Sequence, residues 1–267
     1  MLLLIRGIKW LIYCGEKMNW DKVIFYCFSG TGNTLSAVNK MAEVFEGAGK
    51  SVNIYKIPDD PWVIESHALY IFAFPVYEFG VPGFVQEWID DLPVNEVRLP
   101  AAALSTMAGR SGFVKTPLKK VLLAKNFEPV AVKEIIFPSN FIYFQPESEV
   151  EKVMKVGLIR AERYADDLLA GRGDWPRKSM LSTLLFPFNR LGSKCFSWIF
   201  SHYKAGDSCT HCGLCEKNCP VNNIKVTEKS VEWGRRCQVC LRCINNCPHN
   251  AIRSRVCNFL YRKHYKV

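Results

Sequence analysis

A cysteine pattern that occurs twice near the C-terminus constrains this 267-residue chain more than any other feature. Each copy has three Cys at intervals of three positions, then a fourth Cys that precedes a Pro; the copies are Cys209, Cys212, Cys215 and Cys219, and Cys237, Cys240, Cys243 and Cys247. Three thiolates at this spacing can bind one [4Fe–4S] cluster, while the fourth ligates the neighbouring cluster. The pattern therefore predicts two clusters with crossed ligation, in which Cys247 completes the first set and Cys219 the second.

Zinc is the alternative metal, because paired C-x-x-C sequences also form zinc ribbons. A zinc site is complete with four sulfurs and has no use for a third Cys at the same short spacing. This chain has that third Cys in both copies, as Cys215 and Cys243. The spacing thus favours iron–sulfur clusters over zinc.

Residues 208–253 resemble the bacterial two-cluster ferredoxins over their whole length. The resemblance implies a small α+β domain with two pseudo-symmetric cluster-binding loops, and one-electron transfer at low potential. Ile224 and Ile252 stand at equivalent places after the two Cys-Pro pairs, so the motif is an internal duplication. We expect the apolar side chains of this segment to shield the clusters from water: Ile224, Val226, Val231, Ala251 and Ile252.

Upstream of the cysteines, apolar segments of strand length alternate with segments of helical periodicity. The predicted strands are residues 22–28, 52–57, 68–74, 101–107 and 130–137, and the predicted helices are residues 35–45, 82–92, 116–125 and 150–168. This alternation favours an α/β fold with a five-stranded, doubly wound parallel sheet. Its ligand site is expected at the carboxyl ends of the strands.

The loop at residues 29–34, Ser-Gly-Thr-Gly-Asn-Thr, follows the first predicted strand and opens a helix. Backbone N–H groups and hydroxyls converge there, and the helix dipole favours an anion. The loop lacks the Lys of a P-loop, and Leu35 stands where a dinucleotide fingerprint needs its third Gly. The loop therefore predicts a site for a phosphate monoester, although an ordinary Gly-rich turn is the alternative. Its candidate binding residues are Ser29, Gly30, Thr31, Gly32, Asn33 and Thr34.

This loop and the order of predicted elements over residues 22–170 resemble the flavodoxins. The resemblance implies bound FMN, with its isoalloxazine ring between the loops that follow the third and fourth strands. Tyr77 is the candidate for stacking on the ring, with Phe79 as the alternative. Arg110 stands where flavodoxins usually have acidic residues, so we expect it to raise the potential of the flavin. The candidate residues in these two loops are Pro75, Val76, Tyr77, Thr106, Met107, Gly109 and Arg110.

The two halves together resemble the EFR family of ferrodoxins, anaerobe proteins that fuse a flavodoxin-type domain to a two-cluster ferredoxin. We expect an N-terminal extension at 1–20, an FMN-binding domain at 21–173, an aromatic-rich connecting segment at 174–207 and a ferredoxin domain with a basic tail at 208–267. Residues 1–17 are expected to be dispensable and to form a short helix at most. The connecting segment is expected to pack between the domains; an exposed patch for a partner or a membrane surface is the alternative.

The net charge of +10 shrinks once the cofactors are counted. Two clusters add about −4 and an FMN phosphate about −2 more, which leaves about +4 and removes the case for nucleic-acid binding. No segment is apolar for long enough to span a bilayer. The Cys content is too low for a secreted disulfide scaffold, so we expect a reducing, anaerobic cytoplasm. The Cys outside the motifs are not expected to be ligands: Cys14, Cys27, Cys195 and Cys257.

FMN carries two electrons, one at a time, whereas each cluster carries one. The combination predicts an electron relay that couples one-electron carriers to a two-electron redox partner or substrate. Two alternatives stay open: an oxidoreductase that reduces a small acceptor at its flavin, and a docking subunit that activates another redox enzyme. No catalytic residue is predicted, because no Ser-His-Asp set, Cys-His pair or carboxylate dyad stands out.

Overall fold

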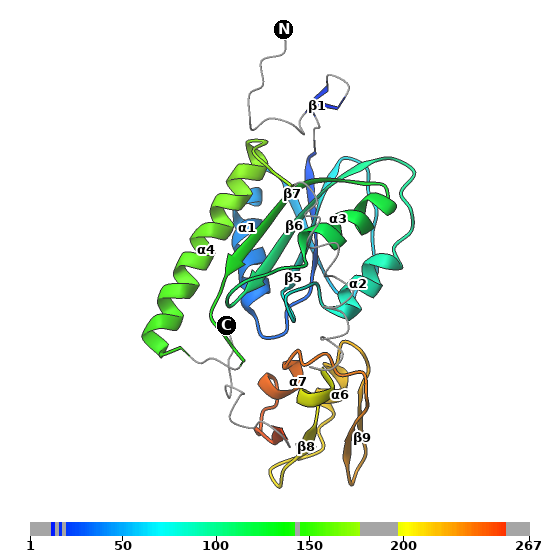
Figure 1. Ribbon diagram of the computed structural model, residues 1–267, viewed down its shortest axis with the longest axis vertical. Coiled ribbons are helices and arrows are strands. Elements are labelled where there is room, and N and C mark those ends of the chain that lie inside the picture. The colour runs from blue at the N-terminus through cyan, green and yellow to red at the C-terminus, as the bar shows by residue number, and fades with distance from the viewer. Residues whose placement is uncertain (1–11, 14–15, 18–19, 142–144, 177–196, 255–267) are drawn as a thin grey trace.

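The computed structural model describes residues 12–13, 16–17, 20–141, 145–176 and 197–254. Two units are distinct: an α/β unit, residues 20–176, and a cysteine-rich unit, residues 197–254, which lies below the sheet in Figure 1. The larger unit has a flavodoxin-like fold, and the smaller one is built from short strands and helices. These two architectures confirm the predicted fold class.

Five parallel strands form the sheet of the α/β unit: β3 (Lys22–Cys27), β4 (Ser51–Lys56), β5 (Ala68–Pro75), β6 (Leu99–Met107) and β7 (Phe127–Ile136). Their order is β4-β3-β5-β6-β7, and every neighbouring pair is parallel. The strand order reverses at β3, because the next strand in the chain, β4, lies on one side of β3 and the strand after that, β5, lies on the other side. Open α/β sheets bind ligands beside such a reversal, outside the carboxyl ends of the strands.

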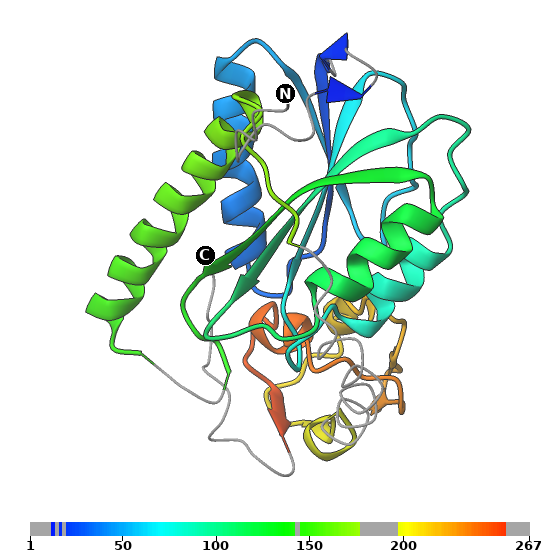
Figure 2. The same cartoon turned by 45° about the horizontal axis from the view of Figure 1, so that its top comes forward.

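Helices cover both faces of this sheet (Figure 2). One face is covered by α1 (Asn33–Gly47) and α4 (Glu147–Leu169), and the other by α2 (Gly83–Asp90) and α3 (Lys115–Ala124). Residues 68–74 of β5 are buried throughout, because a central parallel strand meets a helix layer on each side. This burial on both faces explains why the sequence of β5 is an unbroken apolar run.

The edge strand β7 begins three residues earlier than the sequence predicts, at Phe127 instead of residue 130. In the structure Pro129 lies on an edge strand, next to a register shift opposite Ala101 and Ala102, where a missing donor is tolerated.

The cysteine-rich unit consists of two antiparallel strand pairs and two short helices in contact with each other. Its elements are β8 (Tyr203–Ala205), α6 (Leu214–Lys217), β9 (Ile224–Val226), β10 (Val231–Trp233), α7 (Arg242–Asn245) and β11 (Ile252–Ser254). β9 pairs with β10 and β8 with β11, so strands from both ends of the unit close it around the cysteines.

Two expectations about the flanking segments are only partly covered by the described residues. β1 (Ile12–Tyr13) pairs antiparallel with β2 (Glu16–Lys17), so the expected short helix is wrong at these positions; helices this short are marginal without packing. In the connecting segment, Trp175 is buried in the α/β core, whereas Trp198 is 72% exposed. The remainder of the predicted interdomain packing, residues 177–196, lies outside the described residues.

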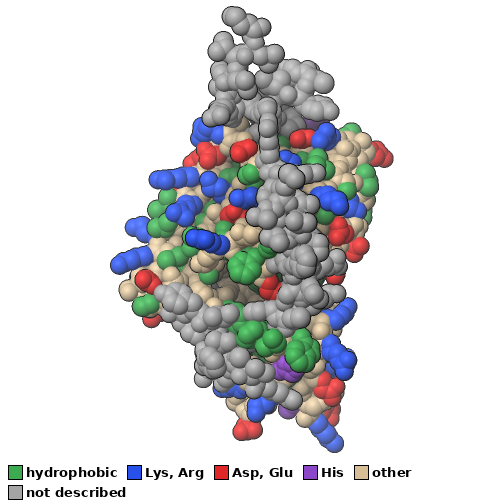
Figure 3. All heavy atoms as spheres, viewed as in Figure 1, with side chains coloured by type: hydrophobic (Ala, Val, Ile, Leu, Met, Phe, Trp, Pro, Cys, Tyr) green, Lys and Arg blue, Asp and Glu red, His purple; other side chains and the backbone are tan. Residues whose placement is uncertain are grey.

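On the surface in Figure 3, Lys and Arg side chains are spread between acidic ones and do not gather in one patch. Within the described part of the chain, no helix is both long and apolar enough to cross a membrane.

Candidate functional site

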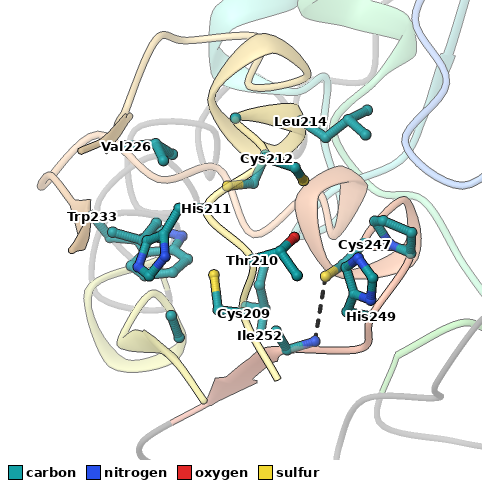
Figure 4. Close-up of a pocket in the computed structure, with 16 residues that line it drawn as sticks. Cys209, Thr210, His211, Cys212, Leu214, Val226, Trp233, Cys247, His249 and Ile252 are labelled. Carbon is teal, nitrogen blue, oxygen red and sulfur yellow. Dashed lines mark hydrogen bonds between the residues drawn. The ribbon is translucent and has the colours of Figure 1, made fainter. Parts of the chain in front are cut away.

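The first cysteine pocket combines residues from both copies of the motif (Figure 4). Cys209, Cys212 and Cys215 of the first copy line it together with Cys247 of the second. The remaining wall is largely apolar, with Val226, Val231, Trp233, Ala251 and Ile252. Cys212 is exposed, so this pocket opens towards solvent.

The second cysteine pocket has the reciprocal composition. Cys237, Cys240 and Cys243 of the second copy line it together with Cys219 of the first. Equivalent backbone donors serve the two crossing cysteines: the Asn223 N–H is 3.2 Å from Cys219 Sγ, and the Ala251 N–H is 3.3 Å from Cys247 Sγ. The duplication in the sequence is therefore also a duplication in space.

The eight cysteines fall into these two pockets in the crossed sets that the spacing predicts. Burial raises the pKa of Cys237 to about 12 and that of Cys240 to about 11, so these thiols are neutral until a metal displaces their protons. No group of three or more metal-binding side chains in the described residues is close enough to hold a single ion. The sulfurs instead surround a space, which fits a cluster; ligation itself stays a prediction.

A cavity of about 600 Å³ lies at the carboxyl ends of the strands. It falls within the usual range for small-molecule sites, roughly 300–1,000 Å³. Loops that follow β3, β5, β6 and β7 form most of its wall. The cysteine-rich unit supplies the rest of the wall, with Gln238, Val239, Cys240 and Leu241.

The loop at residues 29–34 forms one end of the cavity. Gly32 has φ of 108°, a conformation that favours glycine, and its N–H donates to Ser29 Oγ at 3.1 Å. The Asn33 amide donates to the Pro138 oxygen at 3.0 Å, and the Asn140 amide donates to Thr31 Oγ1. α1 begins directly after this loop, with Gly32 as its N-cap residue, and the N-terminus of a helix favours an anion.

The predicted residues of this loop have different surroundings. Ser29, Gly30, Thr31, Asn33 and Thr34 line the cavity, whereas Gly32 does not. Thr34 is buried, and its hydroxyl lies 2.7 Å from the hydroxyl of Thr106 on β6. This pair ties the loop to the sheet, and direct contact of Thr34 with a phosphate stays a prediction.

The predicted ring loops also line the cavity, and their two aromatic side chains differ in exposure; stacking of either on a ring stays a prediction. Tyr77 is half-buried and packs edge-on against Phe28, with 6.3 Å between ring centroids, so it is not an exposed loop tip. Phe79, the alternative for stacking, is 60% exposed. The other predicted residues lie in the wall with them: Pro75, Val76, Thr106, Met107, Gly109 and the exposed Arg110.

Sequence reasoning missed part of this wall. Ser139, Asn140 and Phe141 follow the last strand of the sheet, and their position at its carboxyl end was a usable signal. Glu78 and Ala108 belong to loops already identified. Residues 238–241 had no such signal, because only the packing of the two units brings them to the cavity.

The two units meet closely beside the cavity. A Cβ atom on Gly30 would lie 2.5 Å from the Cys240 backbone oxygen and 2.8 Å from the Tyr77 hydroxyl. A Cβ atom on Gly83, at the start of α2, would lie 3.3 Å from Gln238 Oε1. The loop that carries Cys237 and Cys240 therefore packs directly on the α/β unit.

Comparison with protein families gives one match, the 4Fe-4S binding domain, at residues 206–225. The chain combines a flavodoxin-like fold with a 4Fe-4S binding domain. A comparison with curated proteins found no match. The family match covers the first cysteine copy up to Cys219, so the cluster of the second copy stays a prediction.

Among solved structures, the chain is similar to a flavodoxin of Streptococcus pneumonia TIGR4, with 18% identity and a TM-score of 0.37 over 56% of this chain and 97% of that one. It is similar to the rubredoxin oxygen:oxidoreductase of Desulfovibrio gigas, with 19% identity and a TM-score of 0.35 over 57% of this chain and 38% of that one. For the two-electron reduced flavodoxin of Megasphaera elsdenii the values are 14% and 0.33, over 53% and 98%. The strand order, independently of these values, is that of a flavodoxin-like sheet.

Proposed function

We propose that the protein is a flavin and iron–sulfur electron-transfer protein that relays electrons between two [4Fe–4S] clusters and FMN. In this role the protein couples a one-electron carrier to a two-electron partner or substrate. We also propose that it is a member of the EFR ferrodoxins. The proposal divides the chain into an FMN-binding domain at 21–173, a connecting segment at 174–207 and a two-cluster domain at 208–267. The family match and the flavodoxin-like fold support the coarser statement, electron transfer by flavin and iron–sulfur groups.

The shared wall of the large cavity carries the proposal. One cavity is lined both by residues of the loop at 29–34 and by residues 238–241, the loop between two cysteines of the second set. Residues 238–241 would therefore place the loop of the second cluster in the wall of a flavin site within the same chain. Positioning two redox groups against each other is the contribution that a fold makes to cofactor chemistry.

The residues of the cavity suit FMN. Ser29, Thr31 and Asn33 line the cavity at the N-terminus of α1 without any acidic side chain among them, which suits a phosphate dianion. Val76, Phe79 and Met107 supply apolar surface for the ring. When bound, FMN takes up one or two electrons, and each cluster takes up one.

The positions of the two cysteine sets support a sequence of transfer. Of the eight motif cysteines, only Cys240 lies in the wall of the flavin cavity. Cys212 of the first set is exposed. We therefore assign the first set to exchange with a soluble carrier and the second set to exchange with the flavin.

Anaerobic reconstitution with iron, sulfide and FMN tests this function. The protein should bind about eight iron, about eight sulfide and one FMN per chain, as two clusters of this type require. Once less than one equivalent of reductant has been consumed, flavin absorbance should decrease further with an observed rate constant that does not depend on protein concentration. An observed rate constant proportional to protein concentration would show transfer between molecules and would overturn the relay.

A flavin-dependent reductase of a small acceptor is the second candidate. Phe79 and Arg110 are exposed at the wall of the cavity, so an acceptor could reach a bound ring from solvent. Sustained turnover of a quinone or nitro compound by the isolated protein would favour this function over the relay.

A further inference from the structure

The two cysteine motifs differ in charge at three aligned positions: Leu214 and Arg242, Glu216 and Ile244, and Lys217 and Asn245. Of these, the first pair concerns the walls of the two pockets, because Glu216, Lys217, Ile244 and Asn245 do not line them. Aligned from their first cysteines, the copies place Leu214 and Arg242 at the same point, directly before the third Cys. Leu214 lines the first cysteine pocket, and Arg242 lines the second. Both residues begin equivalent short helices, α6 and α7, so the backbone around them is the same.

The side chain of Arg242 lies between the two units. Its Nη2 is 3.4 Å from Asp59 Oδ2, and its guanidinium carbon is 5.6 Å from the centre of the Phe28 ring. Phe28 immediately precedes the loop at residues 29–34. Arg242 therefore joins the second cysteine loop to the base of the predicted anion loop.

This guanidinium is partly buried and incompletely neutralised. The Arg242 side chain is 17% exposed, and its Nη1 is buried with no hydrogen-bond partner among the described residues. Its acidic neighbour, Asp59, has a side chain that is 46% exposed, so water screens that carboxylate. An Arg stays protonated at any ordinary pH, and its charge acts strongly where water is excluded.

The first cysteine pocket has no equivalent charge. No Lys or Arg lies among its lining residues, and Leu214 is 40% exposed. The hydrogen bonds from Asn223 and Ala251 to the crossing sulfurs match in the two pockets, so they do not distinguish them. The second pocket has one further hydrogen bond, from the Val239 N–H to Cys237 Sγ at 3.4 Å. Charge and solvent exposure are the other differences that can separate two clusters of the same type.

We propose that Arg242 is a positioning residue that raises the reduction potential of the second cluster and so offsets the effect of that cluster's burial. Reduction adds a negative charge to the cluster, and burial disfavours that charge. The guanidinium favours the reduced form by attraction. Its contacts with Phe28 and Asp59 hold it, and the loop that carries it, against the flavin domain. This inference rests on the proposed function, since it requires two clusters.

Redox titration of the anaerobically reconstituted full chain tests the inference. Arg242→Leu gives the second copy the residue of the first. In this variant the reduction step of one cluster should move to a lower potential by at least 59 mV, a tenfold change in the equilibrium constant for one electron. Iron content should stay at about eight per chain. Leu214→Arg should raise the other step, by less, because position 214 is exposed. Arg242→Lys should restore most of the lost potential.

Two further variants separate charge from structure. Asp59→Asn removes the ion pair but keeps the cation, so the step that falls in Arg242→Leu should rise or stay unchanged. A fall in that same step would show that loss of the contact, not loss of charge, causes the effect, and would overturn the inference. Arg235→Leu removes a charge of the same kind from an exposed site nearby, and it should leave both steps in place.

The outcomes also separate the inference from the function on which it rests. Two cluster steps that Arg242→Leu leaves unchanged would overturn the inference alone. Arg242→Leu and Leu214→Arg acting on the same step would overturn it as well. Fewer than two cluster steps in the unaltered protein would overturn the proposed function and the inference with it.

Discussion

The backbone oxygen of Cys240 lies so close to Gly30 that a Cβ atom on Gly30 would approach it to 2.5 Å. One residue belongs to the second cysteine loop and the other to the predicted phosphate loop. Gly30 does not have positive φ, so packing between the two units, and not backbone conformation, requires glycine here. The contact makes the interface sensitive to a single methyl group.

Gly30→Ala should therefore separate the units or strain both loops. Overpacking of this kind costs about 1–3 kcal/mol, so the free energy of unfolding should fall by that amount and FMN should bind more weakly. Anaerobic urea unfolding and fluorescence titration with FMN measure the two effects. Gly47→Ala is the matched control, because nothing lies within 4 Å of the new methyl group. Equal effects of both substitutions would contradict the close contact.

Thr31 and Thr34 should respond differently to truncation, although the sequence assigns both to one site. Thr31→Ala should weaken FMN binding by about 1–2 kcal/mol, the range for losing a hydrogen bond to a charged group. Thr34→Ala should lower the free energy of unfolding by about 1–3 kcal/mol, because it leaves the buried Thr106 hydroxyl unpaired. Titration with FMN and urea unfolding distinguish these outcomes. The assignment fails if Thr31→Ala binds FMN normally.

Cys27 should be inert, in contrast to a cluster ligand. Burial raises the pKa of Cys27 to about 12, so its thiol stays protonated as pH rises from 7 to 9. Only the thiolate is an effective nucleophile. Iodoacetamide at pH 9 should label Cys27 in the unfolded chain but not in the native one, as mass spectrometry of the peptides would show. Cys27→Ala should retain all the iron that the unaltered protein binds.

Arg110 should influence the flavin but not the clusters. Arg110→Glu replaces a positive charge in the cavity wall by a negative one, so the potential of the bound flavin should fall. Because Arg110 is exposed, the shift should shrink as salt is raised. Spectroelectrochemical titration at low and high salt measures both effects. Lys120→Glu on the exposed face of α3 supplies the same charge change as a control, and an equal shift there would remove the special role of Arg110.

The sequence by itself determined the elements of this protein and the grouping of its cysteines. Apolar runs such as residues 68–74 and the helical periodicity of residues 150–168 predicted β5 and α4, because local periodicity records which face of a segment is buried. The two cysteine copies predicted the crossed sets that line the two pockets, because short loops fix where consecutive sulfurs can point. Errors arose at the starts of β6 and β7, which include Pro100 and Pro129 and begin before the first residues of the predicted strands.

Only the tertiary structure decided how the two halves meet. Cys240 lies beside Gly30, and Arg242 lies against Phe28 and Asp59, although these residues are far apart in the chain. Leu214 and Arg242 have the same place in the motif, yet the Arg242 side chain is 17% exposed and contacts Asp59 of the α/β unit, whereas Leu214 is 40% exposed. Spacing along the chain records contacts within a loop, whereas contacts between units depend on how whole surfaces fit together. For that reason the shared cavity and the partly buried cation beside it became visible only in the folded protein.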